Sequence, residues 1–217
     1  MSKKEILKLV AGFRKFRDKY FAGEHALYAR LSSTTNGGGQ APKTLIIGCS
    51  DSRVDPAIIT SASPGELFIV RNIANLVPPY ETKGGRHGVS SAIEFAVINL
   101  KVENVIVLGH RQCGGIRALM TNQLVRPGGF VEQWMNIARE AKERVLSKFA
   151  GADEDVLCRH CELESIITSL ENLRTFPFVE EAIQERGLTL MGIYFDLEQG
   201  TLLEYDSEIK QFKNIEL

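Results

Sequence analysis

Four short apolar runs, rich in aliphatic and β-branched residues, predict buried strands along the chain. They lie at residues 44–48, 67–70, 105–108 and 188–195. None of them alternates strictly between apolar and polar positions, so each is expected to be buried on both faces. Strands of this kind are typical of parallel sheets that are covered by helices.

Helical patterns occupy most of the sequence between these runs. Helices are predicted at residues 91–101, 131–148, 162–173 and 179–186, where apolar positions recur at spacings of three and four. A last hairpin strand is expected near residues 202–205. The predicted fold class is therefore α/β, a parallel-core β-sheet flanked by helices, with a C-terminal edge strand.

The first twenty residues form a separate amphipathic pattern. Apolar side chains recur there at helical spacing, with basic side chains between them. The apolar residues are Ile6, Leu9, Val10, Phe13, Phe16 and Tyr20. This pattern favours a helix that packs on the protein or on a second subunit over a membrane-surface or targeting helix. Because residues 32–43 are rich in chain-breaking residues, we expect an N-terminal helical arm at residues 1–35 and an α/β catalytic domain at residues 36–217.

Composition and charge exclude several kinds of partner. The 217 residues are 44% hydrophobic and 24% charged with a net charge of −1, as in ordinary globular proteins. The chain has no excess of basic residues, so we expect no nucleic-acid partner. No apolar stretch is long enough for a signal peptide or a membrane span, so we expect no membrane partner and a cytoplasmic location. In a reducing compartment, the four cysteines are more typical of metal ligands, redox groups or buried thiols than of disulfides.

Polar side chains follow two of the predicted strands directly. Cys49, Asp51 and Arg53 come after the first strand, and His110 and Cys113 come after the third. The carboxyl ends of parallel strands lie at one edge of the sheet, and ligands bind there where the strand order reverses. Thiolate and imidazole are ligands that zinc prefers, and three protein ligands leave a fourth position open. The pattern predicts a catalytic Zn²⁺ site made of Cys49, His110 and Cys113.

Asp51 and Arg53 are close enough in the chain to form a carboxylate–guanidinium pair. An ordinary surface ion pair is the alternative. Because Asp51 lies near Cys49, its carboxylate either accepts a hydrogen bond from zinc-bound water or ligates zinc itself. Arg53 would decide between these states by holding the carboxylate away from the metal.

Two motifs resemble the signature segments of β-class carbonic anhydrases of the plant-like and bacterial kind. They are GCSDSR at residues 48–53 and GHRQCGG at residues 109–115. Further similar segments follow in the order of that family, at residues 64–75, 87–102, 169–179 and 192–206. The resemblance covers most of residues 40–206.

This resemblance implies an enzyme, a lyase that converts carbon dioxide reversibly to bicarbonate and a proton by attack of zinc-bound hydroxide. Cys49, His110 and Cys113 match the zinc ligands of the family, and Asp51 with Arg53 matches its catalytic dyad. The resemblance also implies an obligate homodimer, often assembled further, for instance into a homotetramer.

Four residues match substrate-binding positions of the family. Gln40 corresponds to a glutamine that reaches the substrate from across the subunit interface, and Phe68 and Ile73 correspond to apolar walls of the carbon dioxide site. Phe95, a further wall residue, stands where many plant-like members have a tyrosine. Arg111 departs from the pattern, because the family usually has a small polar residue there.

A second group of metal-ligating side chains is formed by Cys158, His160 and Cys161. Buried, reduced thiols are the favoured interpretation of this group, with a redox role or further metal binding as alternatives. Two other functions therefore stay open. One is a non-catalytic zinc or redox-sensing module that uses all four cysteines, and the other is a related enzyme that acts on carbon disulfide or carbonyl sulfide.

Overall fold

The computed structural model describes residues 2–22, 27–32, 39–83, 87–123, 126 and 128–215. The chain divides into two compact units, Met1–Ala41 and Pro42–Leu217. The boundary predicted between residues 35 and 36 lies outside the described residues.

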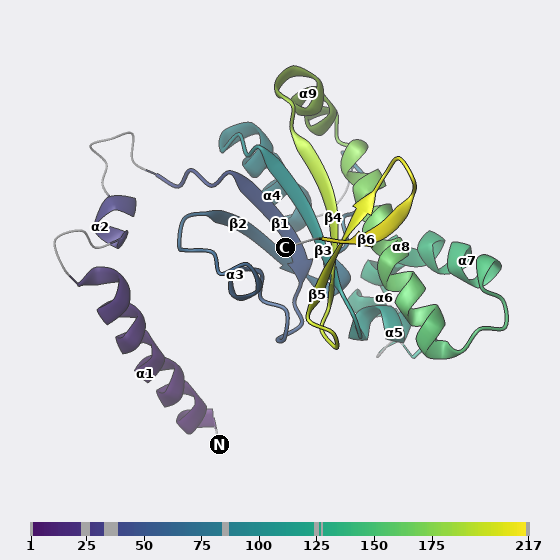
Figure 1. The fold of residues 1–217 in the computed structure, drawn as a ribbon, viewed down its shortest axis with the longest axis horizontal. Coiled ribbons are helices and arrows are strands. Elements are labelled where there is room, and N and C mark those ends of the chain that lie inside the picture. The colour runs from purple at the N-terminus through teal and green to yellow at the C-terminus, as the bar shows by residue number, and fades with distance from the viewer. Residues whose placement is uncertain are drawn as a thin grey trace. The chain divides into compact units, whose positions relative to one another are not determined.

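The first unit contains α1 (Ser2–Phe21) and α2 (Leu27–Leu31) (Figure 1). Aromatic rings connect the two helices, with Phe21 stacked on Tyr28 at a centroid distance of 4.7 Å. Most apolar side chains along α1 are exposed, from 50% at Phe21 to 75% at Leu9. Within its own unit, this helix therefore has an apolar surface that α2 leaves exposed.

The second unit is built on a six-stranded sheet with the order β2-β1-β3-β4-β5-β6 (Figure 1). Its strands are β1 (Thr44–Cys49), β2 (Leu67–Asn72), β3 (Asn104–His110), β4 (Thr189–Asp196), β5 (Thr201–Asp206) and β6 (Gln211–Asn214). The first four are parallel, and β5 and β6 are antiparallel. This arrangement confirms the α/β class with a parallel core. The predicted edge strand is present as β5, but β6 extends the sheet by one strand beyond it.

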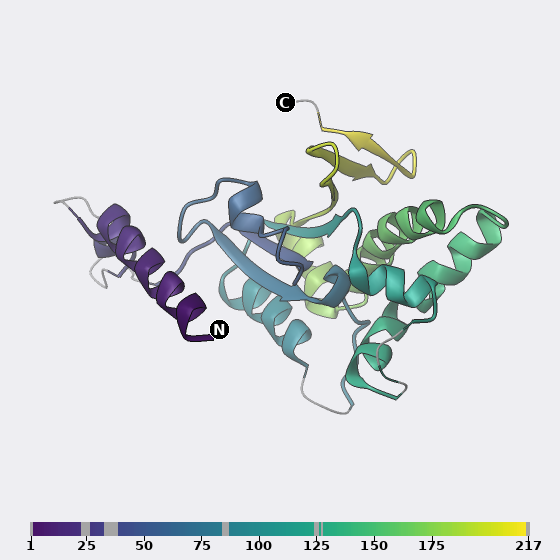
Figure 2. The same cartoon turned by 90° about the horizontal axis from the view of Figure 1, so that it is seen from below.

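Helices surround this sheet and bury its apolar runs. They are α3 (Pro56–Ile59), η1 (Ile73–Asn75), α4 (Gly88–Glu94), η2 (Phe95–Asn99), α5 (Gly114–Met120), α6 (Phe130–Met135), η3 (Asn136–Ala138), α7 (Arg139–Lys148), α8 (Glu154–Arg174) and α9 (Pro177–Arg186). Leu45, Ile47 and Tyr194 of the sheet are fully buried in one core cluster with α8 and α9. A second cluster gathers around Cys49 and Cys113, beneath α5, α7 and α8. Figure 2 shows α7 and α8 side by side.

The helix that carries Cys158 and Cys161 begins well before its predicted start. α8 begins at Glu154, not near residue 162, so Cys158 and Cys161 lie inside it. Acidic residues fill its first turn, where they interact favourably with the positive end of the helix dipole. None of the helices in the described residues has the length and apolar character that a bilayer span requires.

The order of the strands places two loops side by side. From β1 the chain passes to β2 on one side, and then returns to β3 on the other side of β1. The direction of winding therefore reverses between β1 and β3, whose carboxyl ends are neighbours. In open α/β sheets this is the place where ligands bind.

Candidate metal centre and active site

Three potential metal donors meet at this reversal point. Cys49 is the last residue of β1, His110 is the last residue of β3, and Cys113 is the N-cap of α5. Their donor atoms all lie within 4.8 Å of one another, and all three residues are buried. The tertiary structure thus brings together two segments that are distant in the chain.

The ring of His110 is held in the orientation of a metal ligand. Its Nδ1 lies 2.8 Å from the carbonyl oxygen of Arg111. Because a carbonyl only accepts, Nδ1 carries the proton and Nε2 has a lone pair available. That Nε2 is buried and has no hydrogen-bond partner among the described residues. An unsatisfied buried polar atom costs about 1–3 kcal/mol, a cost that coordination of a cation would remove.

The pKa values of the two thiols are shifted in opposite directions. The hydrogen bond from Cys113 lowers the pKa of Cys49 to about 4, with further help from His110 and against the effect of burial. Cys113 shows the opposite shift, because the contact with Cys49 and its own burial both raise its pKa. A divalent cation at this place would stabilise both thiolates at once.

Asp51 and Arg53 form a bidentate pair next to this cluster. Oδ1 of Asp51 accepts from Nε of Arg53 at 3.0 Å, and Oδ2 accepts from a terminal guanidinium nitrogen at 2.9 Å. The backbone N–H of Arg53 also donates to Oδ1, at 2.9 Å. These hydrogen bonds from Arg53 hold the pKa of Asp51 well below its usual range. The carboxylate is therefore ionised throughout the physiological pH range.

Arg71, which the sequence patterns did not single out, positions the backbone of the same loop. From β2 it donates to the carbonyl oxygens of Cys49 at 2.8 Å and of Asp51 at 2.6 Å. It also binds the carboxylate of Asp55 at 3.0 Å. Asp55 in turn caps α3 by accepting from two backbone N–H groups. The only signal in the sequence is a charged residue at the end of an apolar strand.

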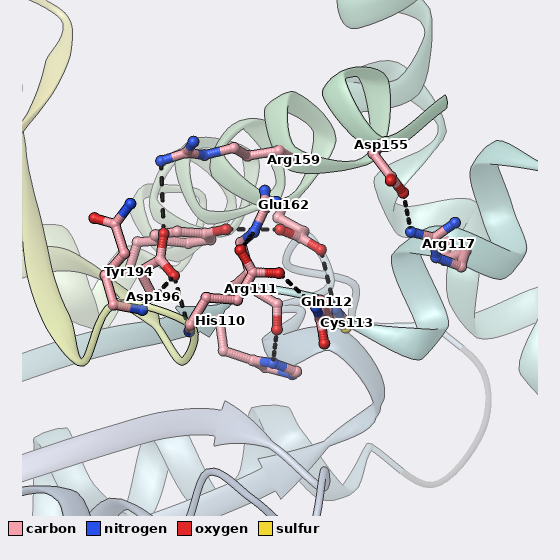
Figure 3. A network of polar contacts seen from close by, with 12 residues as sticks. His110, Arg111, Gln112, Cys113, Arg117, Asp155, Arg159, Glu162, Tyr194 and Asp196 are labelled. Atoms are coloured by element: carbon pink, nitrogen blue, oxygen red, sulfur yellow. Dashed lines mark hydrogen bonds and ion pairs between the residues drawn. The ribbon is translucent and has the colours of Figure 1, made fainter. Parts of the chain in front are cut away.

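A buried carboxylate supports Cys113 from behind (Figure 3). Glu162 is 4% exposed, and its Oε1 accepts the backbone N–H of Cys113 at 2.9 Å. Its Oε2 accepts the hydroxyl of Tyr194 at 2.7 Å. Burial raises the pKa of Glu162, whereas these two donors favour its ionised form. The sequence patterns did not single out this residue either.

Ile73 lies close to the donor cluster. A Cβ atom built on Gly115, the second residue of α5, would lie 2.8 Å from Cγ2 of Ile73. The isoleucine side chain therefore packs against the helix that Cys113 caps, and it is 39% exposed. An apolar group therefore lies near the three donors.

The two predicted phenylalanine walls lie elsewhere in the chain. Phe68 pairs in register with Leu45, four residues before Cys49, which separates it from the cysteine by roughly 13 Å along the strands. Phe95 contacts Phe68 at a centroid distance of 5.9 Å and is 42% exposed. Gln40 belongs to the first unit. The structure therefore brings Phe68 and Phe95 together, but at a distance from the donor cluster of their own chain.

The second cysteine pair lies in the protein core. Cys158 and Cys161 are 3% and 0% exposed on α8. Burial raises the pKa of Cys161 to about 12, so its thiol stays protonated and unreactive. Within the described residues, the only set of three or more metal-ligating side chains is Cys49, His110 and Cys113. These facts support the interpretation of Cys158 and Cys161 as buried thiols.

Fold and site together define an α/β protein with a Cys-His-Cys donor set at the reversal point of a mainly parallel sheet. Residues 44–202 match the family model described as carbonic anhydrase. A carbonic anhydrase of Synechococcus elongatus is 36% identical over 198 residues, which cover 91% of this chain and 70% of the relative. The chain belongs to the carbonic anhydrase family, and within it to the β class.

Solved structures agree with this assignment. The β-carbonic anhydrase CcaA superposes with a TM-score of 0.88 at 33% identity, covering 99% of this chain and 93% of CcaA. A tetrameric β-carbonic anhydrase from Sordaria macrospora has a TM-score of 0.77 at 29% identity, with 94% and 96% of the two chains covered. The protein is accordingly an enzyme, a lyase.

Proposed function

We propose that this enzyme catalyses the reversible hydration of carbon dioxide to bicarbonate and a proton, with Zn²⁺ held by Sγ of Cys49, Nε2 of His110 and Sγ of Cys113. The observation that carries this proposal is the convergence of Cys49, His110 and Cys113, whose donor atoms lie within 4.8 Å of one another, while the buried Nε2 of His110 has no hydrogen-bond partner among the described residues. When bound, zinc supplies the Lewis acid that lowers the pKa of a water molecule and so makes a nucleophile near neutral pH.

The Asp51–Arg53 pair assists the attacking water. Two thiolates donate more negative charge than neutral imidazoles would, so this donor set needs further help from the chain. Asp51 is ionised and close to Cys49 in the chain, and it accepts a hydrogen bond from the water and orients it. Because its pKa is held low, Asp51 does not store the proton. Arg53 keeps the carboxylate ionised and in place through two parallel hydrogen bonds.

A second copy of the chain completes the substrate pocket in this proposal. Carbon dioxide is uncharged and suits apolar walls, but of the three predicted wall residues Phe68, Ile73 and Phe95, only Ile73 lies near the donor cluster of its own chain. Phe68 and Phe95 are distant from that cluster and partly exposed, so we assign them, with Gln40, to the pocket of the partner in a homodimer or larger homo-oligomer. The exposed apolar side of α1 and the tetrameric relative support such an assembly. A cytoplasmic location belongs to the same proposal.

Stopped-flow hydration of carbon dioxide on metal-analysed protein tests the reaction. We expect one zinc per chain, loss of activity after removal with a chelator, and recovery on addition of Zn²⁺. Cys113→Ala should lose zinc and activity together, whereas Cys158→Ala, a matched buried cysteine, should keep both. Full activity in protein that contains no metal would refute the zinc assignment. No observation on this chain favours carbon disulfide or carbonyl sulfide as the substrate.

The role of Asp51 has its own test. Asp51→Ala should retain zinc and lose most turnover, because the donors are untouched while the water loses its acceptor. Parent activity in this variant would refute the role of the dyad.

A mixed oligomer tests the contribution of the partner. Gln40→Ala removes the substrate contact that we assign to the neighbouring pocket, and Cys113→Ala removes the metal site. In a hybrid dimer of these variants, one pocket contains both an intact metal site and an intact Gln40, so about half of the parent activity should return. If co-expressed hybrids are no more active than a mixture of the two separate variants, Gln40 does not act across the interface.

A further inference from the structure

A chain of polar contacts connects the turn after β4 to the Asp51–Arg53 pair. Glu198 in that turn accepts from Nε2 of Gln112 at 2.6 Å and from Nε of Arg111 at 3.2 Å. Oε1 of Gln112 accepts from Arg53 at 3.4 Å, and its backbone carbonyl accepts from Arg53 at 3.2 Å. The guanidinium of Arg53 is therefore held by Gln112 in addition to the carboxylate of Asp51.

The chemistry at both ends determines how the amide of Gln112 is oriented. A carboxylate only accepts hydrogen bonds, so Glu198 requires the NH₂ group of the amide on its side. A guanidinium only donates, so Arg53 requires the amide oxygen on its side. If the amide were flipped, its oxygen would face the carboxylate of Glu198, where both groups are acceptors. Its NH₂ group would face the guanidinium of Arg53, where both groups are donors. Only one orientation of Gln112 satisfies both neighbours.

The backbone is also arranged for this contact. Gln112 has a φ of 57°, in the left-handed region that residues other than glycine rarely adopt. The turn that carries Glu198 is anchored by Asp196, which is 2% exposed and accepts the N–H of Glu198 at 3.0 Å. The N–H of Arg111 donates to the carbonyl of Phe195, the neighbour of Asp196, at 2.9 Å. Both ends of the contact between Gln112 and Glu198 therefore rest on the ordered ends of β3 and β4.

We propose that Gln112 and Glu198 are positioning residues for the catalytic pair: Glu198 orients the amide of Gln112, and Gln112 orients the guanidinium of Arg53 and thereby the carboxylate of Asp51. This inference rests on the proposed function of Asp51. The side chain of Arg53 is 48% exposed, so few other contacts restrain it. Without Gln112 the guanidinium would be free to shift, and the carboxylate of Asp51 bound to it would shift as well. Arg111, at a position where the family resemblance leads us to expect a small polar residue, holds Glu198 in place.

Removing the amide while keeping the side-chain length tests the proposal. Gln112→Met should lower kcat about tenfold, because displacement of a reacting group by a fraction of an ångström is costly while the exposed contacts limit the effect. Zinc content and thermal midpoint should stay at the parent values. Glu198→Gln leaves residues 110–113 unchanged and should lower kcat about threefold, since the amide of Gln112 is then less strictly oriented. Parent kcat in Gln112→Met would overturn the proposal, and parent kcat in Glu198→Gln would overturn the part assigned to Glu198.

The matched control is Glu208→Gln in the turn between β5 and β6. It removes the same charge from an exposed turn, and the side chain of Glu208 has no hydrogen-bond or ion-pair partner among the described residues. We expect the parent kcat for this variant. A loss equal to that of Glu198→Gln would trace the effect to net charge and overturn the positioning role.

A double-mutant cycle separates this inference from the proposed function itself. If Gln112 acts through Asp51, then Gln112→Met should cause no further loss in an Asp51→Ala background. A second tenfold loss there would show that Gln112 acts by another route, and would overturn the positioning role. Parent activity of Asp51→Ala alone would instead refute the proposed role of the dyad. If Asp51→Ala is slow and Gln112→Met is not, the dyad stands and the positioning role falls.

Discussion

Replacement of Tyr194 by phenylalanine would remove one hydrogen-bond donor from a buried carboxylate and leave the packing unchanged. Tyr194 is 0% exposed on β4, and its hydroxyl donates to Oε2 of Glu162 at 2.7 Å. Phenylalanine has the same ring, so the change opens no cavity large enough to matter. Among the described residues, the carboxylate of Glu162 would keep only the N–H of Cys113, at 2.9 Å.

The expected cost follows from the burial and charge of Glu162. A hydrogen bond to a charged group contributes about 1.5–3 kcal/mol, roughly twice the value for a neutral pair. Because Glu162 is 4% exposed, bulk water does not replace the lost donor. We therefore expect Tyr194→Phe to lower the free energy of unfolding by about 2 kcal/mol near neutral pH. Burial already raises the pKa of Glu162, and loss of the Tyr194 hydroxyl should raise it further.

Urea unfolding followed by circular dichroism measures this cost. The midpoint should fall with an unchanged slope, at one fixed protein concentration because assembly adds to stability. Tyr205→Phe on β5 is the matched control, since the hydroxyl of Tyr205 makes no hydrogen bond to the described residues. We expect that control to stay within about 0.5 kcal/mol of the parent.

Equal costs for Tyr194→Phe and Tyr205→Phe would refute the reasoning, because Glu162 would then not depend on the hydroxyl. A second arm uses Glu162→Gln, which makes the acceptor neutral. In that background the cost of Tyr194→Phe should fall to about 1 kcal/mol, the value for a neutral hydrogen bond. An unchanged cost would show that the charge of Glu162 plays no part.

Three further predictions follow from the core and from α8. Near pH 8, iodoacetamide should leave Cys158 and Cys161 of the native protein unmodified, because both are buried, and peptide mass spectrometry with and without urea measures this. Burial, followed by nearby positive charges, lowers the pKa of His160 in the folded protein. On acidification the unfolded chain therefore takes up a proton at His160 before the folded chain does, and the free energy of unfolding should fall as pH drops below about 6.5. Urea midpoints measured against pH should show this fall, and His160→Phe should lessen it. Gly192→Ala would place Cβ 2.7 Å from Ile166, which should cost about 1–3 kcal/mol in thermal unfolding and much less in an Ile166→Ala background.

The sequence by itself determined the fold class and the place of the site. Strands buried on both faces must be apolar almost throughout, and the central strands β1 and β3 are recognisable as continuous apolar runs for this reason. β2 and β4 are apolar runs as well, although β2 lies at the edge of the sheet and is only partly buried within this chain. Polar residues directly after two such strands must leave the same edge of a parallel sheet. This argument predicted that Cys49, His110 and Cys113 converge, and in the structure their donor atoms lie within 4.8 Å of one another.

β6 and the first turns of α8 are among the parts of the fold that were not predicted, and the reasons are physical. β6 is a short strand at the edge of the sheet, mostly exposed, so it has no apolar run to mark it. α8 is covered from several sides, and its buried positions include Ser165, Thr168 and Ser169. A helix buried in this way does not keep one apolar stripe, so its first turns were not recognised.

Only the tertiary structure decided which residues support the site and which do not reach it. A glutamate within a helical pattern is usually a surface residue, and Glu162 is buried because α8 packs behind Cys113. The register of β1 with β2 places Phe68 four residues back from Cys49, which no motif indicates. The hydrogen bond between Gln112 and Glu198 connects residues that are 86 positions apart in the chain. Local patterns specify elements, whereas such contacts depend on how the elements pack.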